Sequence, residues 1–467
     1  MVFSSLTFLY VFLPLVFAAY FLVPQRWKNL TLLVFSLVFY AWGEPLYILL
    51  MLGSTAVDFG AGLLLDRFDQ NARARKAIII ASIAISLLTL GVFKYASFFV
   101  GSINSAFGLT LLDPNLPLPI GISFYTFQSM SYTIDLYWRK IPVQRSFLNY
   151  AMYVSLFPQL VAGPIVRYEH VVKEIDNREI TMPQMAEGVK LFIIGLGKKV
   201  LLANNMGSLW TTVKASDYGE LSAATAWLGI LAFTFQIYFD FSGYSDMAIG
   251  LGRMLGFHFP PNFNYPYISR SISEFWRRWH MTLGSWFRTY VYIPLGGNRD
   301  GLAKTIRNLI IVWFLTGLWH GASWNFVLWG LYFGFLIMLE RLFLGKLLER
   351  IPAPLSMMYS FLAVVLGWVL FDVDTLSGAM AYLGAMFGGS GVGADSASGY
   401  LFSAYGITFL LCIIGATALP AKLWERIRAR IPVPAMAAIP VLEVLVLLAA
   451  TAYLVNATYN PFLYFRF

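Results

Sequence analysis

The chain has 467 residues, of which 58% are hydrophobic and only 12% are charged. Soluble domains carry about 25% charged residues, so this composition excludes an ordinary soluble enzyme and predicts a polytopic all-α membrane protein. The net charge of +9 comes from basic residues clustered between apolar segments, a pattern typical of cytoplasmic loops that does not indicate nucleic-acid binding. The single cysteine, Cys412, excludes an intrachain disulfide and a site built from several thiolates.

The first third of the chain alternates apolar segments with basic loops. Segment 3–23 has no basic start and no small-residue cleavage site before Pro24, so we expect a retained helix rather than a removed signal peptide. Basic residues follow this segment and fill the loops 67–76 and 139–145, which places these loops in the cytoplasm and the N-terminus outside. Further apolar segments follow at 30–42, which is short, and at 46–65, 77–100 and 120–138.

The middle of the chain, about 147–305, is less hydrophobic and richer in Gly, Pro and Tyr. Non-helical backbone at membrane depth persists only where protein or a water-filled cavity surrounds it, so re-entrant and interfacial segments are expected here. Simple spans are expected again at 356–370, 401–418 and 433–453, with a tail at 459–467 on the outside. We therefore expect one integral membrane domain, 1–467, with N-terminal spans (1–146), a catalytic core (147–340) and C-terminal spans (341–467).

Segment 273–290 combines arginines and a histidine with several aromatic residues. At 3.6 residues per turn, one face carries Arg277, His280, Gly284 and Arg288. Aromatic side chains occupy another face, so the segment predicts an amphipathic helix that lies at an interface or caps a cavity. A plain interfacial helix with tryptophan anchors is the alternative.

His320 lies in an apolar stretch that is expected inside the membrane. Ionisable residues at bilayer depth are costly and usually face an interior path or cavity. The apolar run 309–319 gives only about 16 Å of helix at about 1.5 Å per residue, which is shorter than a span, so we expect a break at His320. Gly317 and Gly321 would let another group approach closely. The alternative is a histidine that forms a hydrogen bond between helices for packing alone.

Two carboxylates, Asp240 and Asp246, occur in an aromatic run. They could form a proton path, but a role in satisfying backbone groups and arginines is the simpler interpretation. The sequence has no P-loop, no HExxH motif and no GxSxG nucleophile elbow. Its four histidines are too widely separated to indicate a metal site.

Three segments resemble the membrane-bound O-acyltransferase (MBOAT) family: FWRRWHMTL at 275–283, YIPLGG at 292–297 and GLWHGA at 317–322. Four more are similar to the bacterial branch that O-acetylates alginate and other exopolysaccharides, at 1–5, 39–42, 157–164 and 240–246. The resemblance covers positions 1 to about 335, and the remainder matches only in character.

The resemblance implies a ring of spanning helices around a central funnel. It implies an acyltransferase that takes an acetyl group from a cytoplasmic donor substrate, acetyl-CoA, without a bound cofactor or metal. The acetyl group would reach an exported polysaccharide such as alginate through a periplasmic SGNH-type acetyltransferase. The expected location is the bacterial inner membrane, beside the polysaccharide synthesis and export machinery.

The resemblance also assigns residues. His320 matches the family's near-invariant histidine and is expected to be the general base, and His280 matches its second conserved polar position. Four side chains fit as donor-lining residues: Arg277, Trp286, Arg288 and Trp319. The CoA phosphates could be held by Lys198, Lys199, Arg299 and Lys304, although these residues are also explained by topology alone.

Three alternatives remain open at this point. D-alanyl transfer to teichoic acid is the closest enzymatic one. A non-catalytic transporter of an acyl donor or polymer is another, although no inverted repeat supports it. A scaffolding membrane subunit is the third.

Overall fold

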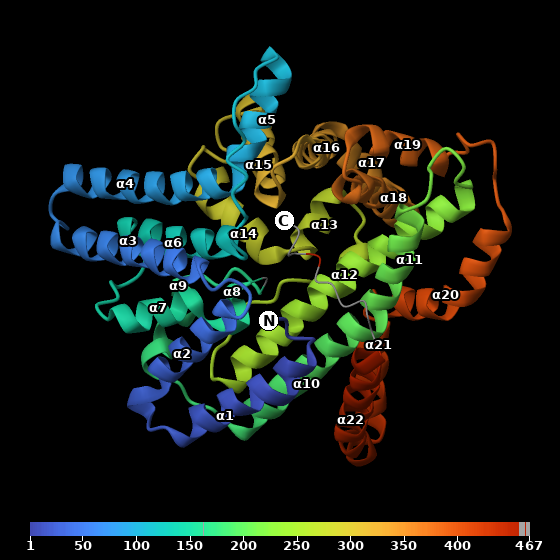
Figure 1. Cartoon of the computed structure of the whole chain (residues 1–467). Helices are drawn as coiled ribbons and strands as arrows, with labels where there is room; N and C mark the ends of the chain where they lie inside the picture. Colours follow the sequence, from blue (N-terminus) through green and yellow to red (C-terminus); the bar gives the residue numbers. More distant parts are fainter. Residues whose placement is uncertain (162, 457–462, 464–467) are drawn as a thin grey trace. The chain divides into compact units, whose positions relative to one another are not determined.

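The computed structural model describes residues 1–161, 163–456 and 463. These residues form helices joined by turns and loops, with no strand among them, as Figure 1 shows. The all-α prediction is therefore confirmed. The chain divides into two compact units, Met1–Phe192 with Met247–Pro260, and Ile193–Asp246 with Pro261–Phe467. The predicted single domain and its subdivisions at 146 and 340 stay predictions.

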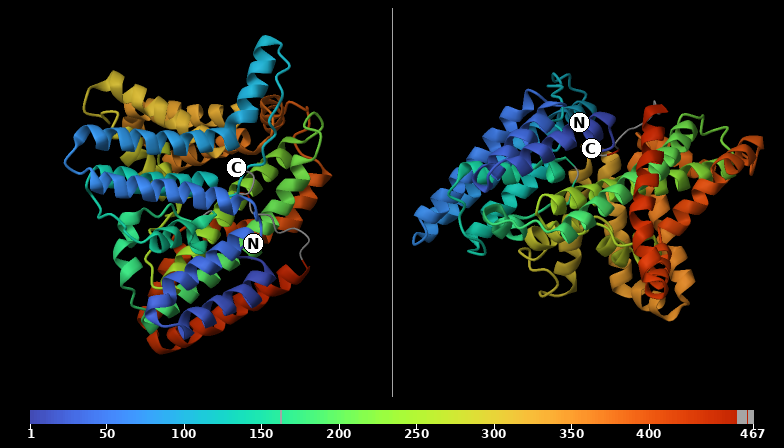
Figure 2. Two further views of the ribbon diagram at one scale, coloured as in Figure 1. Left: turned by 60° about the vertical axis from the view of Figure 1, so that its left-hand side comes forward. Right: turned by 90° about the horizontal axis from the view of Figure 1, so that it is seen from below.

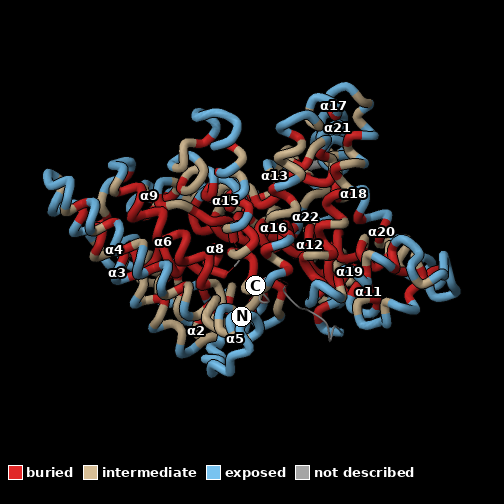
Figure 3. Tube along the Cα trace, turned by 90° about the horizontal axis from the view of Figure 1, so that it is seen from above, coloured by how far each residue is buried: buried red, intermediate tan, exposed pale blue. Residues whose placement is uncertain are grey.

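The first unit begins with a π-helical turn that runs into α1, and most of its other elements are α-helices. Its elements are η1 (Phe8–Phe12), α1 (Leu13–Leu22), η2 (Gln25–Trp27), α2 (Lys28–Ala41), α3 (Tyr47–Arg67), α4 (Ala72–Leu90), η3 (Gly91–Tyr95), α5 (Ala96–Phe107), α6 (Ile122–Tyr137), α7 (Phe147–Ser155), α8 (Phe157–Leu160), α9 (Tyr168–Asp176) and most of α10 (Met182–Gly197). Helices α3, α4 and α6 pack side by side, as both views of Figure 2 show. Helix α6 is buried along almost its whole length, which Figure 3 shows in red.

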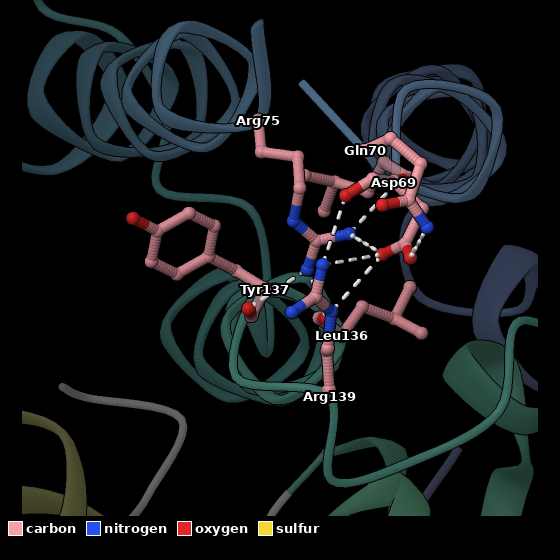
Figure 4. Close-up of polar contacts among 7 residues, drawn as sticks. Asp69, Gln70, Arg75, Leu136, Tyr137 and Arg139 are labelled. Atoms are coloured by element: carbon pink, nitrogen blue, oxygen red, sulfur yellow. Dashed lines mark hydrogen bonds and ion pairs between the residues drawn. The ribbon is translucent and has the colours of Figure 1, made fainter. Parts of the chain in front are cut away.

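Two loops that the sequence places in the cytoplasm meet at Asp69. Arg75 donates to the Asp69 carboxylate at 2.8 Å and to the carbonyl oxygens of Leu136 and Tyr137 at 3.0 and 2.8 Å. Arg139 donates to the same carboxylate at 3.1 Å, and Figure 4 shows this cluster. Because the loops 67–76 and 139–145 join, they lie on the same side, as the positive-inside pattern predicts.

The second unit contains the two motif segments with histidines. Its elements are η4 (Lys198–Ala203), α11 (Asn204–Lys214), most of α12 (Ala223–Met254), η5 (Pro266–Ile268), α13 (Ile272–Arg278), α14 (Met281–Phe287), η6 (Arg288–Tyr292), α15 (Leu302–His320), α16 (Trp324–Leu339), η7 (Glu340–Leu344), α17 (Gly345–Arg350), α18 (Ala353–Asp372), α19 (Leu376–Met386), α20 (Ser396–Gly415), α21 (Leu419–Arg430) and α22 (Pro432–Asn456). Helices α15 and α16 pack extensively against each other. A Cβ on Gly317 would lie 2.3 Å from the Phe326 carbonyl oxygen, and one on Gly330 would lie 2.3 Å from that of Trp313. Glycines therefore let the two helix backbones meet, as small residues do in membrane helix pairs.

Among the described residues, eight helices are long and apolar enough to cross a membrane. They are 47–67, 72–107, 223–254, 302–320, 324–350, 353–372, 396–415 and 432–456. The chain is therefore a multi-pass membrane protein. The predicted tail at 459–467 falls outside the described residues except for Leu463.

Three expectations about helix length were wrong. The region 223–254, expected among re-entrant segments, is a single apolar helix of 32 residues. Helix α6 has only 16 residues, so it falls short of the span expected at 120–138. Helix α15 has 19 residues rather than the short run 309–319, because it begins at Leu302 and includes the basic residues Lys304 and Arg307. Long basic side chains near a helix end can reach the interface, which is why charge hid this start.

Candidate active site

The segment 273–290 is not one amphipathic helix, which corrects the prediction from periodicity. Helix α13 ends at Arg278, and His280 adopts a left-handed conformation with φ 43° and ψ 53° before α14 begins at Met281. A π-helical turn follows at Arg288–Tyr292. A left-handed non-glycine residue costs free energy, so the surrounding packing must hold His280 there.

A polar clamp on Asn262 holds His280. The imidazole Nδ1 lies 3.1 Å from Asn262 Oδ1, which also accepts hydrogen bonds from the backbone N–H and the hydroxyl of Thr282 at 3.2 and 3.0 Å. Because the Thr282 N–H can only donate, the shared asparagine atom is its oxygen, so Nδ1 of His280 carries the proton. His280 is 2% exposed, and this burial lowers its pKa to about 3. The ring is therefore neutral at working pH, with the lone pair on Nε2.

A cavity of about 580 Å³ borders this histidine. The four residues of the predicted polar face all line it: Arg277, His280, Gly284 and Arg288. The break at His280 thus preserves the shared face that periodicity indicated. Of the four predicted donor-lining residues, Arg277 and Arg288 line this cavity, whereas Trp286 and Trp319 do not.

His320 has a different setting. It is the last residue of α15, is 2% exposed, and contacts the rings of Trp319, Trp329 and Phe371 at centroid distances of 4.9, 4.9 and 5.3 Å. The helix break predicted here is confirmed, because Gly321 is extended. His320 is not among the residues that line the cavity at His280.

The rings of Trp319 and Phe326 pack against the histidine-containing segments. The Trp319 ring contacts both histidines, since its centroid lies 5.8 Å from His280 and 4.9 Å from His320. The group that exploits Gly321 is the Phe326 ring, which would lie 2.2 Å from an added Cβ. The predicted close approach therefore occurs, but to a neighbouring side chain of the protein.

Asp240 and Asp246 form ion pairs with lysines, not with the arginines that the sequence suggested. Lys199 contacts Asp240 at 2.6 Å and Lys198 contacts Asp246 at 2.6 Å. Lysines held in this way are poorly placed to bind a phosphate. Lys304 lies 3.4 Å from Asp300.

Sequence reasoning missed a second cavity, of about 510 Å³. Arg270, Arg277 and Arg341 line it, and none of the three guanidinium groups forms a hydrogen bond or ion pair with a described residue. Arg277 also lines the cavity at His280, so it lies at the wall of both. Glu274, Glu340 and Glu349 line the same cavity. Because Glu274 pairs with Arg278 and Glu340 accepts from the Ile272 and Ser273 amides, the guanidinium groups are the ones left to bind a phosphate or carboxylate. The described residues contain no cluster of three or more His, Cys, Asp or Glu side chains suited to a metal.

The family model of the membrane-bound O-acyltransferases matches residues 120–369, which include both histidines and both cavities. The chain belongs to the MBOAT family. A membrane O-acyltransferase activity follows from this membership and from the relatives below, which confirms the resemblance and the enzyme class expected from the sequence.

This MBOAT chain is similar to relatives with three different names. It is 44% identical over 391 residues to the probable alginate O-acetylase AlgI of Pseudomonas aeruginosa, covering 83% of this chain and 75% of that protein. It is 36% identical over 432 residues to the peptidoglycan O-acetyltransferase of Helicobacter pylori, covering 84% and 81%. The teichoic acid D-alanyltransferase of Streptococcus thermophilus is 30% identical over 248 residues, covering 49% and 58%.

Proposed function

We propose that the protein transfers an acetyl group from cytoplasmic acetyl-CoA towards hydroxyl groups of an exported polysaccharide such as alginate. The observation that carries this proposal is the cavity at His280, which a neutral imidazole and the side chains of Arg277 and Arg288 line together in the region matched to acyltransferases. The names of two relatives that match more than four fifths of this chain, a probable alginate O-acetylase and a peptidoglycan O-acetyltransferase, favour acetyl as the group transferred.

The chemistry requires an acceptor hydroxyl, a thioester and a base. His320 does not line the cavity at His280, but both imidazoles contact the Trp319 ring. Once the acceptor displaces that ring, His320 acts as the general base and removes the hydroxyl proton as the oxygen attacks the thioester carbonyl carbon. The carbon–sulfur bond breaks, an ester forms, and the proton passes from the imidazolium to the CoA thiolate. A thiolate is a good leaving group, so the residues of the chain suffice for the reaction.

The proton on Nδ1 of His280 limits what this side chain can do in the reaction. Its Nδ1–H is committed to Asn262, so in this tautomer Nε2 can accept a hydrogen bond but cannot donate one to an oxyanion. His280 is therefore suited to orient the attacking hydroxyl. The guanidinium groups of Arg277 and Arg288 supply donors for the developing negative charge.

The arginine-lined second cavity fits the anionic part of the donor. We assign the CoA phosphates to Arg270 and Arg341, with Arg277 at the boundary to the cavity where the thioester reacts. This replaces the assignment to Lys198 and Lys199, which are engaged by aspartates.

The remaining proposals concern location and partners. A periplasmic SGNH-type acetyltransferase would receive the acetyl group, within the polysaccharide synthesis and export machinery of the bacterial inner membrane. The N-terminus would be periplasmic. A reporter fused to the N-terminus that is active only outside the cytoplasm tests this orientation, and an inactive reporter on a stable fusion would reverse it.

The test of the proposed function is a donor assay on the purified protein in lipid nanodiscs. Turnover of acetyl-CoA that depends on His320 supports acetyl transfer. D-alanyl transfer is the second candidate, because a relative at 30% identity carries that activity in its name. Turnover with a D-alanyl carrier protein and none with acetyl-CoA would establish that alternative instead.

A further inference from the structure

A buried glutamate outside the two histidine-containing motif segments, Glu340, holds helix α13, which lies next to the cavity at His280. Glu340 is 7% exposed and begins the π-helical turn η7 within the candidate span Trp324–Arg350. A carboxylate within a membrane span is costly unless several donors compensate it. Its position therefore requires a partner.

The partner is the N-terminus of α13. Glu340 Oε1 accepts from the Ile272 backbone N–H at 2.6 Å, and Oε2 accepts from the Ser273 N–H at 2.9 Å and the Ser273 hydroxyl at 2.6 Å. The first amides of a helix have no acceptor inside the helix, and the partial positive charge at that end favours a carboxylate. One side chain thus caps a helix that lies 67 and 68 residues earlier in the chain.

The helix that is capped has few other means of fixing its start. Helix α13 has seven residues, and isolated helices of that length are unstable. Its own cap, Ser271, satisfies only the Glu274 amide, at 3.0 Å. The rest of α13 is held by ring contacts such as Trp276 with Trp313 and Phe333, both at 4.9 Å. Glu340 therefore sets the position of the first turn.

The π-helical turn is the local device that brings Glu340 to this place. Such a turn adds a residue to the helical repeat and re-aims the side chains next to it, and it occurs often at functional sites. A Cβ on Gly345 would lie 2.6 Å from the Glu340 carbonyl oxygen. The turn thus depends on a glycine directly after it.

The cap by Glu340 affects the cavity at His280, because α13 carries or precedes residues that line it. Arg277 lies about one turn beyond the capped amides, and His280 follows two residues after the end of α13; both line the cavity at His280. Glu340 itself lines the adjoining arginine cavity. We propose that Glu340 is a positioning residue that fixes α13, and with it Arg277 and His280, in the geometry that acyl transfer needs; this rests on the proposed function.

Glu340→Gln tests the proposal, because an amide keeps the size but replaces one acceptor oxygen with a donor that faces another donor. Glu349→Gln is the matched control for exchange alone, since Glu349 lines the same cavity and has no hydrogen-bond or ion-pair partner among the described residues. Glu425→Gln, at an exposed residue of α21 that lines neither cavity, is the control for kcat and KM. The first readout is amide hydrogen exchange over 272–278 in nanodiscs, which needs no activity. We expect exchange at Ile272 and Ser273 to rise at least about 10-fold in Glu340→Gln and to stay unchanged in Glu349→Gln.

The second readout separates positioning from general damage. We expect kcat with acetyl-CoA to fall about 10- to 100-fold in Glu340→Gln, as small misplacements do, with KM within about 3-fold and partial recovery in Glu340→Asp. Unchanged exchange at Ile272 and Ser273 overturns the cap, and raised exchange with normal kcat overturns its link to the site.

Ser273→Ala carries the test if Glu340→Gln does not accumulate in the membrane. This variant removes only one of the three hydrogen bonds between Glu340 and α13 and leaves the one from the Tyr359 hydroxyl at 3.5 Å, and we expect a fall in kcat of about 3- to 10-fold. Normal kcat and normal exchange in Ser273→Ala would then overturn the proposal. Failure of the proposed function itself is distinct, because it would show as wild-type protein without His320-dependent turnover.

Discussion

His280 and His320 are equally buried, each 2% exposed, yet they differ in almost every other respect. Asn262 sets the tautomer of His280, which borders a cavity, whereas His320 ends helix α15 against the rings of Trp329 and Phe371 and does not line that cavity. Both imidazoles contact the Trp319 ring. The difference shows that burial alone does not define a role. The first setting orients a ring and keeps it neutral, and the second protects a ring from water, which suits a base that acts only when the substrate is in place.

Replacement of His320 should have the largest effect on activity. We expect His320→Ala to lower acetylation of the exported polysaccharide by about 10³-fold, within the range for loss of a general base. Acetate released from the polymer by alkali, normalised to the amount of protein in the membrane, measures this effect. His170→Ala is the control, because His170 belongs to the first unit and lines neither cavity. Full acetylation by a normally expressed His320→Ala protein would contradict the assignment.

The clamp on His280 should matter less than the base. We expect Asn262→Ala to lower kcat about 10-fold, because the Nδ1 proton then loses the acceptor that fixes the tautomer. Asn264→Ala is the control, since Asn264 is exposed and contributes only backbone groups to hydrogen bonds. Equal kcat values for the two variants would show that the tautomer of His280 set by Asn262 does not affect catalysis.

Substitutions in the arginine cavity should weaken donor binding and leave the chemical step at the two histidines unchanged. We expect Arg270→Gln and Arg341→Gln to raise the KM for acetyl-CoA about 10-fold each while kcat stays within about 2-fold. Arg350→Gln serves as the control, because Arg350 lines neither cavity. A fall in kcat without a change in KM would place the donor phosphates elsewhere.

The smallest expected effect concerns pH. The pKa of His280 is lowered to about 3 by burial, so the neutral ring predominates at every pH above that value and does not titrate between pH 5 and 9. We therefore expect the acidic limb of the kcat/KM profile to lie at the same pH in His280→Asn as in the wild type, although the plateau is lower. An acidic limb that disappears in His280→Asn would show that His280 sets it.

The sequence predicts much of the fold because hydropathy and basic loops report the bilayer directly. Segment 46–65 and the C-terminal spans lie within or close to helices of the structure. The break at His320 was predicted from the short apolar run 309–319, and it is confirmed although the helix begins earlier than that run, at Leu302.

Other features depend on tertiary contacts that periodicity does not show. No glycine or proline occurs from Ser273 to Leu283, so the left-handed His280 was hidden in a regular helical pattern. The cap by Glu340 joins residues 68 positions apart. One signal for it was present, however, because an acidic residue in the apolar stretch 324–344 indicates a specific partner.

Turnover of acetyl-CoA by the purified protein in nanodiscs tests most directly whether His280 and His320 take part in acyl transfer. It is measured with a hydroxyl acceptor for the wild type, His320→Gln and His280→Gln. The account predicts free CoA and acetyl ester in equal amounts from the wild type, a loss of about 10³-fold in His320→Gln and a smaller loss of about 10²-fold in His280→Gln. Equal turnover by all three proteins would contradict acyl transfer at these two imidazoles.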